Sequence, residues 1–172
     1  MINKKLMATS IVAVSAGAVA LLTKSSSAMK SINQKGIDLI KSFEGLRLTS
    51  YLCPAGVWTI GYGHTHNVRE GQTITEKQAE TLLRNDIAVY EDGVRNYTKN
   101  VVLNTNQFSA LVSFAFNCGL ANLKSSTLLK KVKANPNDST IRDEFNKWVY
   151  ANKVVMAGLQ KRRKAEADLY FS

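Results

Sequence analysis

The chain has 172 residues, of which 45% are hydrophobic and 21% are charged, with two cysteines and two prolines. This length and composition suit one globular domain with a core, and they exclude collagen-like, disulfide-scaffold and wholly disordered proteins. Lysine and arginine outnumber aspartate and glutamate by 23 to 13, and the formal net charge of +10 favours a polyanionic partner such as a cell-wall polymer, an anionic membrane surface or nucleic acid.

The first predicted element is the uncharged segment 6–23, between Lys5 and Lys24. As a helix it would reach about 27 Å, which is marginal for a hydrocarbon core about 30 Å thick. Three interpretations compete: a cleavable secretory signal ending at the small residues 26–28, an uncleaved anchor with its basic end in the cytoplasm, and a buried helix of the domain. The flanking lysines and the serine linker disfavour the buried helix. We therefore expect an export segment, residues 1–28, followed by a globular domain, residues 29–172, with 20 bases and 13 acids.

The domain is predicted to open with a helix that begins at a capping box of Ser31 and Gln34 and ends at Gly45, so that Glu44 closes its apolar face. The next stretch, 48–63, is rich in aromatic and β-branched residues. It is interrupted by the turn sequence Pro-Ala-Gly at 54–56, which predicts a β-hairpin.

A second capping box, Thr75 with Gln78, opens a helix that is predicted to end near Tyr97 and is long enough to bridge two lobes. Further helices are predicted at about 105–117, 126–133, 139–150 and 158–171. The expected architecture is α+β, with a small hairpin lobe and a larger helical lobe joined by the long helix.

Several kinds of site have no motif in this sequence. It contains no Gly-rich phosphate loop, no His-x-x-x-His pair, no Cys-x-x-Cys pair and no Gly-x-Ser-x-Gly elbow, so we expect no cofactor and no metal site. The basic clusters 130–133 and 161–164 carry no interleaved aromatic residues, so they do not indicate a nucleic-acid partner. Such clusters are more often solvated helix faces.

Three polar residues around the predicted hairpin form a candidate catalytic set. In a hairpin that turns at 54–56, Cys53 and Thr59 can approach each other across the two strands. Glu44, beside apolar residues at the end of a helix, can serve as a general acid. Taken singly, each has a commoner explanation: Glu44 as an exposed helix-end carboxylate, Cys53 as a small buried hydrophobe and Thr59 as an ordinary strand residue. Only their combined spacing favours a catalytic site.

The stretch 42–65, SFEGLRLTSYLCPAGVWTIGYGHT, closely resembles the active-site region of the phage lysozymes of glycoside hydrolase family 24. These enzymes place a catalytic Glu, eight residues, Asp or Cys, five residues and then Thr, and Glu44, Cys53 and Thr59 match that spacing. Further similarity lies at 116–119, 126–129 and 158–166, so the resemblance covers about residues 31–172. It implies a lysozyme-like fold.

The resemblance also implies an endolysin that hydrolyses the β-1,4 bond between N-acetylmuramic acid and N-acetylglucosamine in peptidoglycan, for host cell lysis. Glu44 would protonate the leaving oxygen, Cys53 would stand where many relatives carry a water-activating Asp, and Thr59 would hold the attacking water. A thiol of ordinary pKa is mostly protonated at neutral pH. The Cys53 substitution therefore keeps open an alternative, a non-catalytic wall- or membrane-binding protein that retains the fold.

Other candidates have two interpretations each. His64 either lines the sugar cleft or fixes its loop, and Asn117 either lies near the catalytic Glu or is a helix C-terminal amide. Arg162 and Arg163 either pair with a buried acid or, more often for a basic run, lie on the surface.

The two cysteines suggest a bond between Cys53 and Cys118, but that bond would consume the proposed catalytic thiol. Some anchored relatives store a catalytic cysteine in a disulfide by using an extra cysteine, which this chain lacks. We therefore predict free thiols, with Cys118 buried after its helix.

The weakly apolar segment 6–23 resembles the signal-anchor-release segment of some endolysins. It carries small residues at helical spacing, Ala13, Ala16, Gly17 and Ala20. This resemblance implies a type II anchor in the host inner membrane and later release into the periplasm, with signal cleavage as the alternative. We expect a monomer that binds peptidoglycan glycan strands and no nucleic acid.

Overall fold

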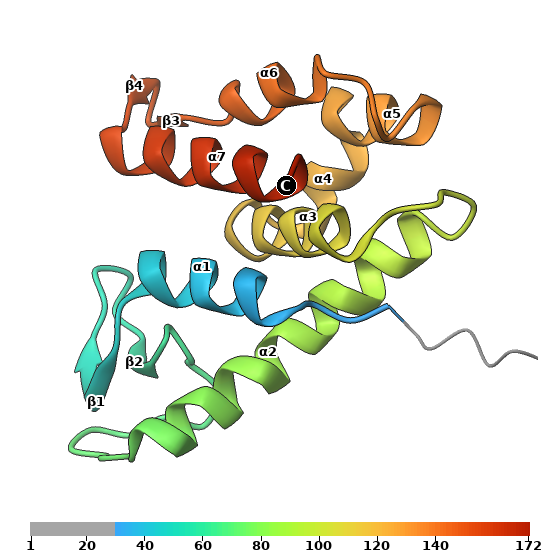
Figure 1. The fold of residues 1–172 in the computed structure, drawn as a ribbon. Coiled ribbons are helices and arrows are strands. Elements are labelled where there is room, and N and C mark those ends of the chain that lie inside the picture. Colours follow the sequence, from blue (N-terminus) through green and yellow to red (C-terminus); the bar gives the residue numbers. More distant parts are fainter. Residues whose placement is uncertain (1–29) are drawn as a thin grey trace, which may run out of the picture.

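The computed structural model describes residues 30–172, and the predicted export segment, residues 1–28, lies outside this part of the chain. Two lobes are joined by one long helix, α2 (Figure 1). Among residues 30–172 no helix is both long and apolar enough to cross a bilayer. In chain order the elements are α1 (Gln34–Glu44), β1 (Arg47–Leu52), β2 (Trp58–Gly61), α2 (Glu76–Tyr97), α3 (Thr105–Cys118), α4 (Leu120–Ser125), α5 (Thr127–Ala134), α6 (Ile141–Asn146), β3 (Tyr150–Ala151), β4 (Val154–Val155) and α7 (Ala157–Tyr170).

Helix α1 begins at a different cap from the one predicted. The side chain of Asn33 accepts a hydrogen bond from the Gly36 N–H at 2.9 Å, so Asn33 is the N-cap and the predicted capping box of Ser31 and Gln34 is wrong. The Ile32 N–H donates instead to the Glu91 carboxylate on α2 at 2.6 Å, which holds this stretch outside the helix. The helix ends where predicted, because Gly45 has a φ of 72°, a conformation that favours glycine. Glu44 is therefore its last residue.

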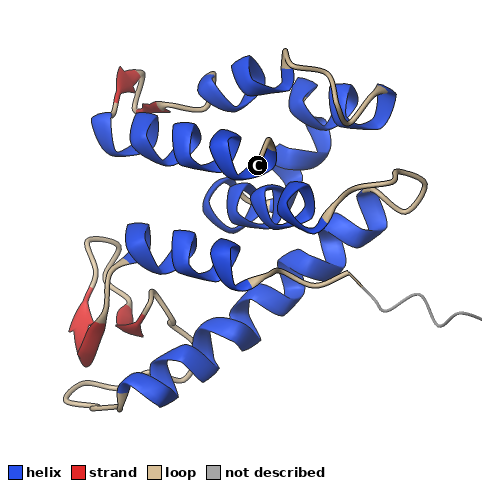
Figure 2. Cartoon of the chain, viewed as in Figure 1, coloured by secondary structure: helices blue, strands red, loops and turns tan. Residues whose placement is uncertain are grey.

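The predicted hairpin is confirmed. Strands β1 and β2 are antiparallel, with Tyr51 opposite Thr59 and Leu52 opposite Trp58. The turn is closed by the Cys53 N–H, which donates to the Val57 carbonyl at 3.0 Å. A second, shorter strand pair, β3 and β4, lies toward the same edge of the molecule in Figure 2.

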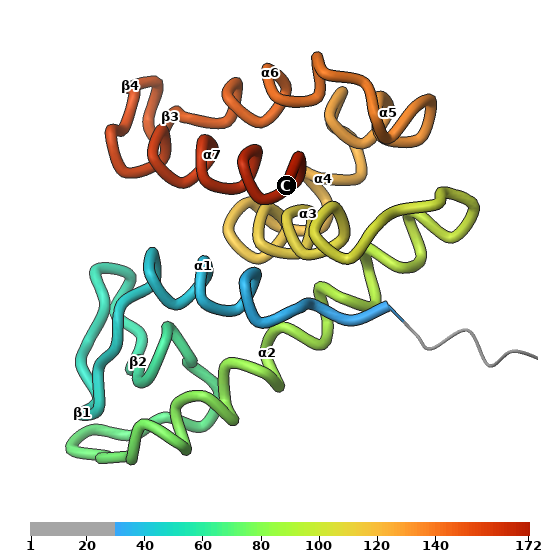
Figure 3. The backbone as a smooth tube through the Cα atoms, in the orientation of Figure 1, coloured from blue at the N-terminus to red at the C-terminus, as the bar shows by residue number. Residues whose placement is uncertain are grey.

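Helix α2 has the predicted limits. It begins at the capping box of Thr75 and Gln78 and ends at Tyr97. It contacts β2 in the small lobe and both α3 and α4 in the large lobe, and the backbone path in Figure 3 shows it running from one lobe to the other. The predicted α+β arrangement of a small hairpin lobe, a larger helical lobe and a connecting helix is confirmed.

The Thr75 cap should contribute measurably to stability. We expect Thr75→Ala to lower the free energy of unfolding by about 1 kcal/mol, because the Gln78 N–H, which donates to the Thr75 hydroxyl at 3.2 Å, loses its acceptor. Urea unfolding measures this change. Thr81→Ala, an exposed site later in the same helix, is the control and should change stability by less than about 0.5 kcal/mol. Equal effects of the two substitutions would contradict the capping role.

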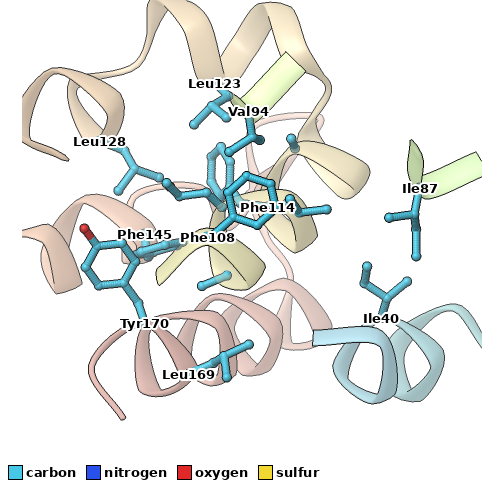
Figure 4. Packing of buried hydrophobic residues seen from close by; sticks show 14 of the residues in the cluster. Ile40, Ile87, Val94, Phe108, Phe114, Leu123, Leu128, Phe145, Leu169 and Tyr170 are labelled. Carbon is cyan, nitrogen blue, oxygen red and sulfur yellow. The ribbon is translucent and has the colours of Figure 1, made fainter. Parts of the chain in front are cut away.

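The main core surrounds α3, whose residues from Gln107 to Ala115 are all buried. Helices α1, α2 and α7 pack against it, and Figure 4 shows Phe108, Phe114, Phe145 and Tyr170 gathered in the large lobe. The middle of α3 is therefore enclosed on all sides, which gives the two lobes a common central helix.

The C-terminal third differs from the prediction in two places. A helix was expected over 139–150, but α6 ends at Asn146 and the chain then forms the β3–β4 hairpin. Asn152 and Lys153 have φ values of 51° and 65°, which make a two-residue turn, and three of the four strand residues are β-branched or aromatic. The short helix α4 was not predicted.

Candidate active site

Glu44 lies at the end of α1 and contacts α7. Its Oε1 accepts a hydrogen bond from Nη1 of Arg162 at 2.7 Å, and its side chain is 24% exposed. The Arg162 guanidinium also lies over the Phe43 ring, 5.6 Å from its centroid. The surroundings predicted for Glu44, an apolar helix face, therefore describe only part of its environment. Its main partner is a buried cation from the other lobe.

Arg162 and Arg163 are both buried, so of their two interpretations pairing with a buried acid is confirmed and the more usual place on the surface is wrong. Arg162 donates to Glu166 Oε1 at 3.2 Å, Arg163 Nε lies 3.1 Å from Glu166 Oε2, and the Ser113 hydroxyl donates to Oε1 at 2.8 Å. Glu166 follows the two arginines by four and three residues, so all three lie on one side of α7. This spacing was visible in the sequence and is the signal that could have identified the cluster.

Asn117 is tied to the same cluster. Its side-chain oxygen accepts a hydrogen bond from Nη2 of Arg163 at 2.8 Å, while its side chain remains exposed. Asn117, Glu44 and Arg162 line one cavity of about 400 Å³. The rest of its lining consists of Phe43, Ala151, Met156, Gly158 and Leu159. The structure thus brings two of the predicted site residues, Glu44 and Asn117, together in a cavity that also has apolar lining residues.

Cys53 and Thr59 lie on the β1–β2 hairpin, which follows α1 directly, and they do not line this cavity. Thr59 is buried, and its hydroxyl donates to the Val57 carbonyl at 3.0 Å. The backbone N–H groups of Val57 and Ala55, and then the Thr59 hydroxyl, lower the pKa of the Cys53 thiol. Thr59 is registered opposite Tyr51 and Cys53 bonds to Val57, so Cys53 and Thr59 lie two positions apart across the hairpin rather than directly opposite each other.

His64 is held on both sides of its ring. Nδ1 lies 2.9 Å from an Asp86 carboxylate oxygen on α2, and Nε2 lies 3.0 Å from the His66 carbonyl. His64 also lines a second cavity, of about 330 Å³, with Tyr90 and Phe116 among its neighbours. His64 can therefore both line a cleft and fix its loop, but the hydrogen bonds of its ring nitrogens serve to hold the loop to α2.

Both cysteines are free thiols. Cys118 is the last residue of α3 and is only partly buried, less than predicted. Burial raises the pKa of the Cys118 thiol, and Nη1 of Arg163 donates to its sulfur at 2.8 Å. Cys118 therefore belongs to the structural cluster around Arg163, whereas Cys53 is the thiol that ionises more readily. Within residues 30–172 no group of His, Cys, Asp and Glu is arranged to hold a metal ion.

The fold and this site have counterparts among known proteins. Residues 41–166 match the family described as phage lysozyme. An endolysin of Acyrthosiphon pisum secondary endosymbiont phage 1 is 46% identical over 145 residues, which cover 82% of this chain and 98% of that protein. A SAR-endolysin of Haemophilus phage HP1 is 33% identical over 150 residues, 80% of each chain. The muramidase domain of SpmX from Asticaccaulis excentricus superposes with a TM-score of 0.76 at 38% identity, covering 83% of this chain and 98% of that one.

Proposed function

This chain belongs to the phage lysozyme family, and on that basis we propose that it is an endolysin that hydrolyses the β-1,4 bond between N-acetylmuramic acid and N-acetylglucosamine of peptidoglycan, for host cell lysis. One observation carries the proposal. The matched residues, 41–166, include Glu44, the hairpin beside it and the α7 residues that enclose its cavity. A carboxyl group at the edge of a partly apolar hollow is what general acid catalysis on a glycan requires.

We assign the roles as follows. Glu44 protonates the leaving oxygen, Cys53 activates the attacking water as a thiolate, and Thr59 orients that water. The lowered pKa of the Cys53 thiol supports its part, because a larger fraction of it is ionised at neutral pH. Asn117, on the rim of the Glu44 cavity, and His64, on the second cavity, contact the glycan.

Loss of turbidity of a purified peptidoglycan suspension tests the function. The wild-type chain should clear the suspension and release fragments with N-acetylmuramic acid at the new reducing end. No clearing by the wild-type chain, under both reducing and oxidising conditions, would instead indicate the non-catalytic binding protein.

The pH dependence of clearing tests Cys53. A base that works as a thiolate loses activity as the pH falls through its pKa, by about tenfold per pH unit. In Cys53→Asp the base is a carboxylate, which stays ionised to much lower pH than a thiolate. The fall in clearing rate on the acidic side should therefore begin at a lower pH, and in mild acid the variant should clear faster than wild type. The rate of clearing against pH, measured for both proteins, gives the result.

Cys53→Ser is the matched control, because a hydroxyl of similar size does not ionise in this range. It should be inactive at every pH. Full activity of Cys53→Ser would contradict the base role, and a covalent glycosyl adduct on the Cys53 sulfur, detected by mass spectrometry, would make it a nucleophile instead.

For the rest of the chain we propose that residues 1–28 export the enzyme and that residues 29–172 form the catalytic domain. Residues 6–23 anchor it in the host inner membrane with the N-terminus inside, before release into the periplasm as a monomer. The uncharged segment and the relative named SAR-endolysin support this order of events. N-terminal sequencing of the periplasmic protein is the test: a start near Met29 would mean cleavage, and a start at Met1 release.

A further inference from the structure

The β3–β4 hairpin is a defined structure, and no other part of residues 30–172 covers its outer side chains. Tyr150 pairs with Val155 and Ala151 with Val154 across an antiparallel ladder, closed by the turn at Asn152 and Lys153. All four strand residues are exposed. The hairpin projects at the edge of the large lobe, beyond the start of α7 (Figure 1).

Its exposed side chains are large and apolar. The exposed fractions are 62% for Tyr150, 61% for Val154, 43% for Val155 and 44% for Met156. Four such residues within seven positions form an apolar cluster rather than scattered exposure. Clusters of this kind on a soluble domain mark a surface that contacts another apolar phase.

Along the sequence, the residues on both sides of the hairpin carry charge of one sign. From residue 145 to residue 165 the sequence contains six lysines and arginines and no aspartate or glutamate. Lys153, in the turn, and Lys161, on α7, are exposed and form no ion pair among the described residues. The asymmetry extends to the lobes: residues 104–172 carry 11 bases and 5 acids, whereas residues 30–103 carry 9 bases and 8 acids. The apolar cluster therefore lies in the basic half of the domain.

We propose that the β3–β4 hairpin docks on the surface of an anionic lipid bilayer, with Tyr150, Val154 and Val155 entering the headgroup region and Lys153 and Lys161 facing the phosphates. Lysines favour any anionic polymer, but aliphatic side chains gain free energy only where hydrocarbon receives them, and tyrosine is enriched at that boundary. A lipid surface satisfies both requirements, while a glycan strand satisfies only the first. The hairpin region reaches the Glu44 cavity through Ala151 and Met156, but its contact with lipid does not depend on the proposed hydrolysis.

The hairpin's contact with lipid can be measured in the full chain with a tryptophan placed on it. Tyr150→Trp is mixed with phosphatidylglycerol vesicles that contain brominated lipid, which quenches tryptophan at the bilayer, and with matched phosphatidylcholine vesicles. The unsubstituted chain supplies the signal of Trp58 and Trp148, which is subtracted. Val102→Trp, at a position that is 89% exposed between α2 and α3, is the control for a tryptophan elsewhere on the surface. Residues 6–23 are present in every variant, so only the position of the added tryptophan differs.

We expect strong quenching of the added tryptophan at 150 on phosphatidylglycerol, and weak quenching on phosphatidylcholine or at 102. Adding Lys153→Ala should raise the lipid concentration for half-maximal quenching by about fivefold. Adding Val154→Asn and Val155→Asn should weaken quenching further, and circular dichroism verifies that these exposed substitutions leave the fold intact. Equal quenching at 150 and 102, or on both lipids, would overturn the proposal. So would a concentration-dependent emission shift without vesicles, because a second copy of the chain would then cover the hairpin.

Discussion

Glu44→Gln is expected to slow peptidoglycan clearing by about 10²–10⁴-fold, the range that a positioned general acid contributes. Glutamine keeps the size of the side chain and still offers an oxygen to Arg162, which donates to Glu44 at 2.7 Å. It cannot give a proton to the leaving oxygen. The loss should therefore appear in the rate of clearing at saturating peptidoglycan, with little change in the amount of protein that sediments with the polymer.

Asp38→Asn provides the matched control. Asp38 is an exposed carboxylate on the same helix, where it accepts a hydrogen bond from Gln34 at 2.8 Å, and the substitution makes the same change from acid to amide. We expect wild-type clearing from it. Equal clearing by Glu44→Gln and wild type would mean that Glu44 is not the acid.

The parts of the fold that could be predicted from the sequence are those set by neighbours in the chain. The Thr75 capping box, the turn before Val57 and the stop at Gly45 each depend on residues within four positions, and each lies where it was expected. The start of α1 was placed two residues too early, although its cap, Asn33 with the Gly36 N–H, is also local. The contact that holds Ile32 outside the helix is not local, because its N–H is bound by Glu91, 59 residues later. The end of α6 was placed too late, because the predicted helix was extended over aromatic and β-branched residues that favour a strand.

The site shows the same division. The spacing of Glu44, Cys53 and Thr59 is local and was recognisable, whereas the ion pair of Glu44 with Arg162 joins residues 118 apart. A run of four basic residues indicates a solvated surface unless the acid that pairs with it is known. Here that acid is Glu166, close in sequence, but its burial depends on α3 packing across α7 and supplying Ser113.

The largest effect on stability is expected at Glu166, which is fully buried between Arg162 and Arg163. Glu166→Gln leaves two buried guanidinium groups with Glu44 as their only charged partner among these residues. Removing one member of a buried ionic cluster typically costs about 3–5 kcal/mol, because the remaining charge stays away from water without compensation. Guanidinium chloride unfolding should show a loss of this size.

Asp168→Asn is the control on the same helix. Asp168 is about half exposed and pairs with Arg142 and Lys164, and surface pairs of this kind contribute less than about 1 kcal/mol. Similar losses in the two variants would contradict the buried-charge argument.

Glu166→Gln should also slow clearing at temperatures where the variant remains folded. Arg162 is held by Glu166 on one side and Glu44 on the other, so its guanidinium is free to shift toward Glu44 once the first contact weakens. A tighter contact would hold the Glu44 side chain closer to α7 and change the position from which it donates to the substrate. Comparing the clearing rates of folded Glu166→Gln and Asp168→Asn therefore separates a role in positioning the acid from a purely structural role. Unchanged clearing by Glu166→Gln would mean that Glu166 has the structural role alone.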